Sequence, residues 1–182
     1  MSAESSRSSI RDDRAFFSPD RVYRYSLTRE IAPLTGDGLV TFIGLNPSTA
    51  DEMQDDPTIR RCIGFARRWG FAQLKMLNLY AYRATDPNDL LRYEGDKIGP
   101  ENDCTIAKVV GGSDLVVCAW GGTTGPIGDG SRARAILSLI AAPHCIGLTQ
   151  AGAPRHPLYV RADTPPRPFA HCPPQAIWRA AA

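Results

Sequence analysis

Residues 39–61 read LVTFIGLNPSTADEMQDDPTIRR. The stretch begins with a continuous apolar run, residues 39–45, which predicts a buried parallel strand. Asn46 opens a polar loop, and Asp56-Pro57 predicts the start of a helix, because Asp is a favoured N-cap and Pro suits the first helical position. In an open α/β sheet, a strand followed by a polar loop and a helix places a ligand at the carboxyl end of the strand.

Three more apolar runs predict further buried strands at residues 74–80, 114–120 and 145–148. Helical patterns separate them, and the clearest is residues 57–69, where apolar residues recur at helical spacing. Other helices are expected from Asp86-Pro87, near residues 99–110 and from about Ser131. Strands that alternate with helices predict a three-layer α/β/α fold with a mostly parallel central sheet of about four to five strands.

Residues 22–27 alternate as a strand does, and a Gly36-Asp37-Gly38 turn follows them. We therefore expect an antiparallel hairpin between residues 22–27 and 39–45, with the first strand at an edge of the sheet. The remaining segments predict a flexible N-terminal arm (1–20), a single α/β domain (21–163) and a proline-rich C-terminal tail (164–182).

The composition, with 43% hydrophobic and 22% charged residues, is typical of a soluble globular protein, and a net charge of +2 does not by itself indicate nucleic-acid binding. The chain lacks an apolar stretch of about 18 residues, the length of a membrane span. Its first residues also lack the apolar segment of a signal peptide. Five cysteines form no C-x-x-C pair, so reduced, mostly buried thiols are expected. These features predict a cytoplasmic protein that does not enter the membrane.

The polar residues that follow the four predicted strands should converge, because the carboxyl ends of parallel strands meet at one edge of the sheet. We expect Asn46, Asp51 and His156 to carry the chemistry. An asparagine amide donates and accepts at once, which suits the edge of a nucleobase, while guanidinium groups suit phosphate and an aromatic ring can stack on a base. The expected substrate-binding residues are Pro47, Ser48, Thr49, Arg60, Arg61, Asn78, Tyr80, Arg83, Trp120, Gly121 and Arg155.

Several of these residues have a simpler interpretation. Asn46 before Pro47 also favours an Asx turn that closes its own loop. Ser48 and Thr49 can bond within the same loop, and Trp120 can be a core aromatic. The arginines of residues 57–69 can form a solvated helix face.

The acidic loop leaves two possibilities open. Asp51, Asp55 and Asp56 offer oxygen ligands to a divalent cation. Alternatively, Asp56 caps its helix while Asp55 and Glu52 are solvated. Residues 121–125 precede a helix and can cradle an anion, although they match neither common nucleotide-binding fingerprint. No Cys/His spacing fits a zinc site, and we expect no metal and no cofactor.

The motifs FIGLNPSTAD, DDPTIRRCIGFARRWG, NLYAYRATDP, GPEND, AWG and RHPLYV resemble the bacterial and phage family called domain of unknown function 1643, over roughly residues 22–160. More remotely, the order of parts is similar to the uracil-DNA glycosylase superfamily. In that superfamily a strand ends in a G-I-N-P-G motif, a later strand ends in W-G, and a final loop carries H-P-S-P or N-P-S-G. Residues 44–48, 119–121 and 156–158 stand at the corresponding places here.

The second resemblance implies roles for two residues. Asn46 would position the attacking water, and His156 would stabilise charge on the departing base of an extruded nucleotide. The chain departs from the pattern in having Leu158-Tyr159 in place of serine and proline. It also has no carboxylate at the usual water-activating position unless Asp51 reaches the site.

We therefore expect a glycosylase-like hydrolase that acts on the N-glycosidic bond of a nucleobase, nucleotide or nucleic acid. One alternative is a non-catalytic module that binds a nucleotide or modified base. A second alternative is a metal-dependent hydrolase that uses Asp51, Asp55 and Asp56.

Overall fold

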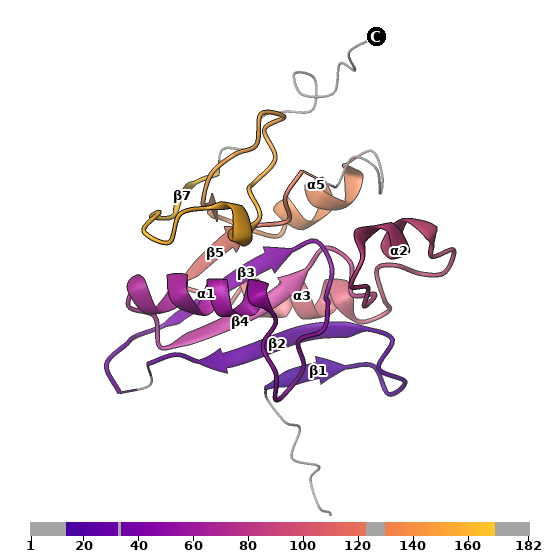
Figure 1. Ribbon diagram of the computed structural model, residues 1–182, viewed down its shortest axis with the longest axis horizontal. Helices are drawn as coiled ribbons and strands as arrows, with labels where there is room; N and C mark the ends of the chain where they lie inside the picture. Colours follow the sequence, from indigo (N-terminus) through magenta and orange to yellow (C-terminus); the bar gives the residue numbers. More distant parts are fainter. Residues whose placement is uncertain (1–13, 33, 123–129, 170–182) are drawn as a thin grey trace, which may run out of the picture.

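A seven-stranded mixed sheet runs through the computed structural model, which describes residues 14–32, 34–122 and 130–169 (Figure 1). The strands are β1 (Ala15–Phe17), β2 (Arg24–Glu30), β3 (Leu39–Gly44), β4 (Gln73–Asn78), β5 (Leu115–Cys118), β6 (Pro143–Cys145) and β7 (Arg167–Pro168). They lie side by side in the order β1-β2-β4-β3-β5-β6-β7.

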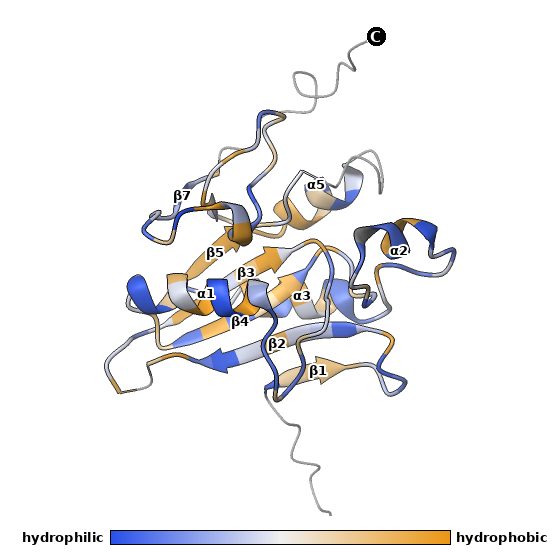
Figure 2. Cartoon of the chain, viewed as in Figure 1, coloured by the Kyte–Doolittle hydropathy of each residue, from blue (hydrophilic) through white to orange (hydrophobic). Residues whose placement is uncertain are grey.

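The centre of this sheet is parallel. β3 pairs with β4 on one side and with β5 on the other, and β5 pairs with β6, all in the parallel sense. β3, β4 and β5 lie at predicted apolar runs, whereas β6 shares only Cys145 with the predicted strand at residues 145–148. Figure 2 shows β3 and β5 as predominantly hydrophobic. Strands buried on both faces need such continuous runs, and the expected mixed α/β class is confirmed.

The edges of the sheet differ from the prediction. β2 pairs antiparallel with β4, with Leu27 opposite Met76, so the predicted hairpin between residues 22–27 and β3 is wrong. β3 already has parallel partners on both sides, which leaves the outer edge of β4 as the place for β2. β1 and β7 add strands within the segments expected to be arm and tail, and they make the sheet wider than predicted. Both are too short to show a periodic pattern.

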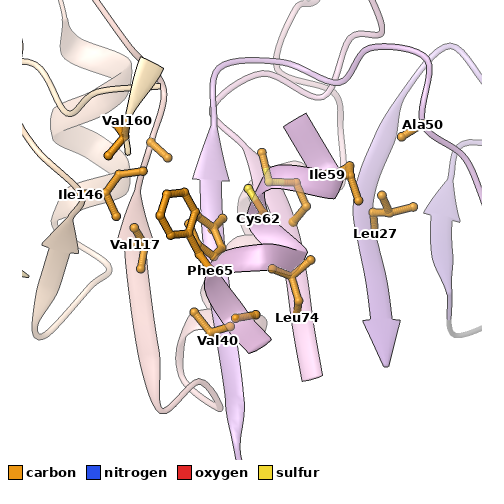
Figure 3. Close-up of a cluster of buried hydrophobic side chains, with 14 residues drawn as sticks. Leu27, Val40, Ala50, Ile59, Cys62, Phe65, Leu74, Val117, Ile146 and Val160 are labelled. Atoms are coloured by element: carbon orange, nitrogen blue, oxygen red, sulfur yellow. The ribbon is translucent and has the colours of Figure 1, made fainter. Parts of the chain in front are cut away.

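Helices cover both faces of the sheet. They are α1 (Pro57–Arg68), α2 (Pro87–Arg92), α3 (Asn102–Val110), α5 (Ser131–Leu137) and a short 3₁₀ helix, η1 (Pro157–Tyr159). On one face α1 packs on the sheet in a cluster that includes Leu27, Val40 and Phe65 (Figure 3). On the other face, Leu90 of α2, Ile106 of α3 and Ile136 of α5 belong to a second cluster.

The sequence signals for α1 are confirmed in detail. The Asp56 side chain caps the helix by accepting the N–H of Ile59 at 2.8 Å, and Pro57 occupies the first turn. Ile59, Cys62 and Ala66 are buried against the sheet, as their helical spacing predicts. This packing holds the first turn of α1 next to the carboxyl end of β3.

Two further expectations concern the chain as a whole. Cys62, Cys118 and Cys145 are free and buried, as predicted, whereas Cys104 is exposed on α3. Among the helices of the described segments, none is long and apolar enough to cross a membrane.

Candidate functional site

A cavity of about 570 Å³ lies at the carboxyl ends of β3, β4 and β5. Its walls come from the loops after these strands, the first turn of α1 and the late loop of residues 149–159. The predicted convergence of distant segments therefore occurs. Of the predicted site residues, the cavity is lined by Asn46, Ser48, Asn78, Trp120, Gly121, Arg155 and His156.

Asn46 joins the loops that follow β3 and β4. Its Nδ2 group donates to the carbonyl oxygen of Ala84 at 2.7 Å and to that of Pro47 at 3.0 Å. Asn46 therefore holds loops together through its amide hydrogens, with one partner in a distant loop, and these bonds differ from those of the predicted Asx turn. Since both amide hydrogens have backbone acceptors, the side-chain oxygen is the group that Asn46 can offer to a ligand.

Asn78 ends β4 and is 1% exposed. With its amide nitrogen facing β3, it donates to the carbonyl oxygens of Asn46 at 3.3 Å and of Leu77 at 3.2 Å. Gly44 makes room for this arrangement, because a Cβ there would lie 2.6 Å from the Met76 methyl carbon and 3.0 Å from the Asn78 amide. The absence of a side chain at residue 44 thus keeps the floor of the cavity open.

His156 begins η1, and its Nδ1 atom accepts the N–H of Leu158 at 3.4 Å. A ring that accepts at Nδ1 carries its proton on Nε2 when it is neutral. Burial lowers the pKa of His156, and the negative charge of Asp56 partly opposes this shift. The site therefore favours a neutral histidine with an Nε2–H donor.

Gly121 brings the end of β5 close to His156. Its φ of +77° is a conformation that residues with a side chain rarely adopt. A Cβ at this position would lie 3.4 Å from the Cβ of His156, and the Gly121 N–H donates to Pro154 at 2.9 Å. Gly121 thereby fixes the spacing between the β5 end and the loop that carries the histidine.

Asp56 and Arg24 also line the cavity. Asp56 was predicted as a helix cap or, in the metal-dependent alternative, as a ligand, whereas Arg24 was not among the predicted site residues. Asp56 is 8% exposed and is the one carboxylate among the described residues of the cavity wall. Arg24 is 2% exposed, although arginine is seldom fully buried without a charged partner. The position of Asp56 after a strand and loop was the signal that could have identified it.

Asp51 lies outside this cavity wall. Its Oδ1 atom accepts the N–H groups of Met53 and Gln54, both at 2.8 Å, and these bonds lower the pKa of Asp51. The carboxylate therefore organises its own turn.

Arg60 and Arg61 contact protein groups away from the cavity. Arg60 donates to the carbonyl oxygen of Asp55, and Arg61 donates to that of Val160. The guanidinium of Arg61 also lies 5.4 Å from the centre of the Phe65 ring. Both side chains tie α1 to neighbouring loops.

The two later arginines differ from each other. Arg83 lies 5.0 Å from the centre of the Phe17 ring and does not line the cavity. Arg155 does line it, and its Nε donates to the carbonyl oxygen of Leu148 at 2.9 Å. Arg155 is therefore the predicted arginine that is placed to meet a ligand.

Three other predicted residues lie outside the cavity wall. The carbonyl of Pro47 serves the loop bonds described above, and the side chain of Thr49 is exposed. Tyr80 packs into the apolar cluster on the opposite face of the sheet. The sequence had not singled out several residues that do line it: Thr58, Met76, Thr149, Gln150 and Tyr159.

The acidic loop does not form a shared ligand set. Asp55 pairs with Arg29 at 2.7 Å, while Asp51 and Asp56 each accept backbone N–H groups. Within the described part of the chain, no group of three or more His, Cys, Asp or Glu residues is arranged to hold a metal ion. Most of the predicted glycine-rich anion site falls on residues 123–129, which lie outside the described residues.

The fold and the site define an α/β protein with a partly polar cavity at the carboxyl edge of its parallel strands. The family model described as "Protein of unknown function (DUF1643)" matches residues 24–158, and the chain belongs to this family, as its motifs predicted. No curated protein and no solved structure matches the chain.

Proposed function

We propose that the protein is a hydrolase with a glycosylase-like fold that cleaves the N-glycosidic bond of a nucleobase-containing substrate. The observation that carries the proposal is that Asn46 and His156, from opposite ends of the domain, line one cavity together with Trp120. In the proposed reaction, water adds to the anomeric carbon, the C–N bond breaks, and the base leaves with the bonding electron pair and gains a proton.

His156 supports the departure of the base. Its neutral ring would donate an Nε2–H hydrogen bond to the base as negative charge develops there. Such a donor is already oriented before the reaction, which is the condition for electrostatic stabilisation of a transition state. The bond from Leu158 to Nδ1 supports this tautomer.

Asp56 is better placed than Asp51 to activate the water. Its Oδ1 atom caps α1, so Oδ2 is the oxygen that would take the proton from water. The Asn46 side-chain oxygen would hold the same water. This chain has no carboxylate at the position where the uracil-DNA glycosylase superfamily carries its water-activating residue. In our proposal, Asp56 takes that role.

The cavity also suits a flat heterocycle. Trp120, Met76 and Leu45 contribute apolar surface, whereas Asn46, Ser48 and Thr149 contribute polar groups. A volume of about 570 Å³ is in the range of pockets that enclose a single small molecule.

The test is an assay for release of free base. The purified protein is incubated with nucleosides, nucleotides and oligonucleotides that carry normal or deaminated bases, and free base is measured by chromatography. Oligonucleotides are also treated with hot alkali to reveal abasic sites. We expect release that falls at least about 100-fold in His156→Gln and in Asp56→Asn, the usual size of an acid–base contribution.

Asp55→Asn is the matched control, because Asp55 is the sequence neighbour of Asp56 and pairs with Arg29 outside the cavity wall. It should retain release, and Asp51→Asn should do so as well. Release that survives in Asp56→Asn but not in Asp51→Asn would contradict our assignment of the carboxylate. If the wild-type protein releases no base from any of the nucleosides, nucleotides and oligonucleotides, the proposal of a hydrolase is contradicted.

A non-catalytic binding module is the second candidate. It is favoured by one observation, that the Asn46 amide hydrogens and one Asp56 oxygen already serve structural bonds. It predicts that a base or nucleotide raises the melting temperature and is recovered unchanged.

A further inference from the structure

Arg24 is a buried cation that forms no ion pair with another described residue. Its Nη1 group donates to the carbonyl oxygen of Ala50 at 2.8 Å, whereas its buried Nε has no hydrogen-bond partner in the described part of the chain. None of the ion pairs among the described residues includes Arg24. Burying a charge that has no ion-pair partner costs free energy. The burial of Arg24 therefore needs a physical reason.

The surroundings of Arg24 lower its pKa on balance. Burial is the main cause that lowers the pKa of Arg24, to about 10, and the positive charges of Arg83 and Arg29 lower it further, while Asp56 opposes the shift. A pKa of about 10 still leaves the guanidinium charged at neutral pH. The position therefore keeps a desolvated positive charge.

The cavity that Arg24 lines has an excess of positive charge. Two guanidinium side chains, Arg24 and Arg155, contribute to its wall, against the single carboxylate of Asp56. The first turn of α1 also faces the cavity, through Thr58 and Ile59, and a helix N-terminus favours an anion. The charge balance thus matches a ligand that carries a negative group.

We propose that the cavity encloses a free small molecule whose anionic group, a phosphate monoester or a carboxylate, is buried against Arg24. The inference deepens the proposed function and rests on it for the nucleobase part of the ligand. A guanidinium with a free N–H pairs strongly with either anion, because charge-assisted hydrogen bonds are the strong ones. This ligand would give the Arg24 guanidinium a direct ion-pair partner and would balance the positive charge that Asp56 alone leaves in the cavity.

The burial of Arg24 also favours a free ligand over a polymer. Arg24 is 2% exposed, so an anion reaches it only after entering the cavity. A phosphodiester in a nucleic acid continues into further nucleotides on both sides, and a cavity of about 570 Å³ encloses one small molecule. A nucleoside monophosphate can bury its terminal phosphate, whereas an oligonucleotide cannot.

The experiment compares binding to the purified full-length protein by calorimetry. The probes are nucleosides, their 5′-monophosphates, inorganic phosphate, benzoate and oligothymidylate. The variants are Arg24→Met, which removes the charge but keeps an unbranched stem, and Arg24→Lys, which keeps the charge. Arg67→Met, on the exposed surface of α1, controls for a general loss of positive charge.

We expect the preferred monophosphate to bind about tenfold tighter than its nucleoside in the wild-type protein, the size of one charge-assisted hydrogen bond. The preference should disappear in Arg24→Met, persist in part in Arg24→Lys and remain in Arg67→Met. Binding of benzoate in place of phosphate, with the same dependence on Arg24, would identify the buried group as a carboxylate. If Arg24→Met does not fold, two other measurements test the anion site. They are the binding of the monophosphate to Arg24→Lys and its competition by inorganic phosphate in the wild type.

The outcomes separate this inference from the proposed function. Equal affinity for nucleoside and monophosphate, a preference that survives in Arg24→Met, or equally tight binding of oligothymidylate would overturn the anion site. If nucleosides lose their base but the monophosphate binds no tighter than its nucleoside, the hydrolase proposal is supported and the anion site is contradicted. If anions bind in an Arg24-dependent way while no nucleoside or nucleotide binds, the anion site is supported and the proposal of a nucleobase substrate is contradicted.

Discussion

The protonation of His156 follows from its burial between the end of β5 and η1. Since burial lowers the pKa of His156 below its ordinary value of 6.5, the unfolded chain binds this proton more readily than the folded protein does. The contribution of His156 to stability is therefore complete above the unfolded pKa. It decreases as the pH falls from that value toward the folded pKa.

We expect this behaviour to appear in urea unfolding measured from about pH 8 down to about pH 5, the range in which histidines titrate. The free energy of unfolding of the wild type should fall more steeply below about pH 6.5 than that of His156→Gln. The variant acts as the control, because it differs from the wild type only in the side chain at residue 156. Parallel curves for the two proteins would show that folding does not lower the pKa of His156.

Gly121 has a backbone conformation that a side chain strains. Gly121→Ala should destabilise the protein by about 1–2 kcal/mol, because a Cβ is unfavourable at its positive φ. The same Cβ also meets His156, so any base release should decrease as well. Chemical denaturation and the release assay measure the two effects separately.

Gly64→Ala is the control for this substitution. Gly64 lies within α1, and a Cβ there meets nothing within 4 Å. Alanine is the better helix former, so the variant should gain up to about 1 kcal/mol. A stabilised Gly121→Ala, or equal effects of the two substitutions, would contradict the strained conformation of Gly121.

At the level of elements, the end of β4 is held from the far face of the sheet by α3 and α5. Asn102 of α3 is 0% exposed and donates from Nδ2 to the carbonyl oxygens of Asn78 at 3.2 Å and Leu79 at 3.1 Å. Arg132 of α5 donates from Nε to the same Leu79 carbonyl at 2.7 Å. These buried bonds fix the strand end that carries Asn78 into the cavity.

Asn102→Ala should therefore destabilise the protein by about 1–3 kcal/mol, since it leaves the Asn78 carbonyl buried without this donor. The free energy of unfolding in urea is the measurement. Asn88→Ala, at an exposed position of α2, should change it by less than about 0.5 kcal/mol. An effect of Asn102→Ala as small as that of the control would show that the buried bonds do not hold β4.

For the whole molecule, the cysteines report on the packing of both faces of the sheet. Burial raises the pKa of Cys62, on the buried side of α1, and of Cys118, at the end of β5. Cys145 is buried as well, whereas Cys104 is exposed. Only an accessible thiol that can ionise reacts readily with an alkylating reagent.

We expect iodoacetamide to label Cys104 in the native protein, while Cys62, Cys118 and Cys145 react only when the domain unfolds. Peptide mapping by mass spectrometry reports each cysteine separately, and the urea-unfolded protein supplies the rate for full exposure. Native-state labelling of Cys62 as fast as that of Cys104 would mean that α1 does not pack on the sheet as described.

Much of the fold could be predicted from local sequence patterns. The apolar runs at residues 39–45 and 74–80 identified β3 and β4, and Asp56-Pro57 identified the start of α1, because burial on both faces and helix capping leave signatures in consecutive residues. The pairing of β2 with β4 was missed, since the alternation of residues 22–27 indicates a strand but does not indicate which strand lies beside it.

The sequence by itself determined the α/β class, the family and the edge of the sheet where a site should lie. Only the tertiary structure decided which side chains reach the cavity. In the folded protein, Asp51 accepts backbone bonds within its own turn, whereas Asp56 lines the cavity. Arg24 is buried in the same cavity wall. The physical reason is that strand and helix patterns depend on neighbours along the chain, whereas the direction and burial of a loop side chain depend on loops that meet only after the sheet has formed.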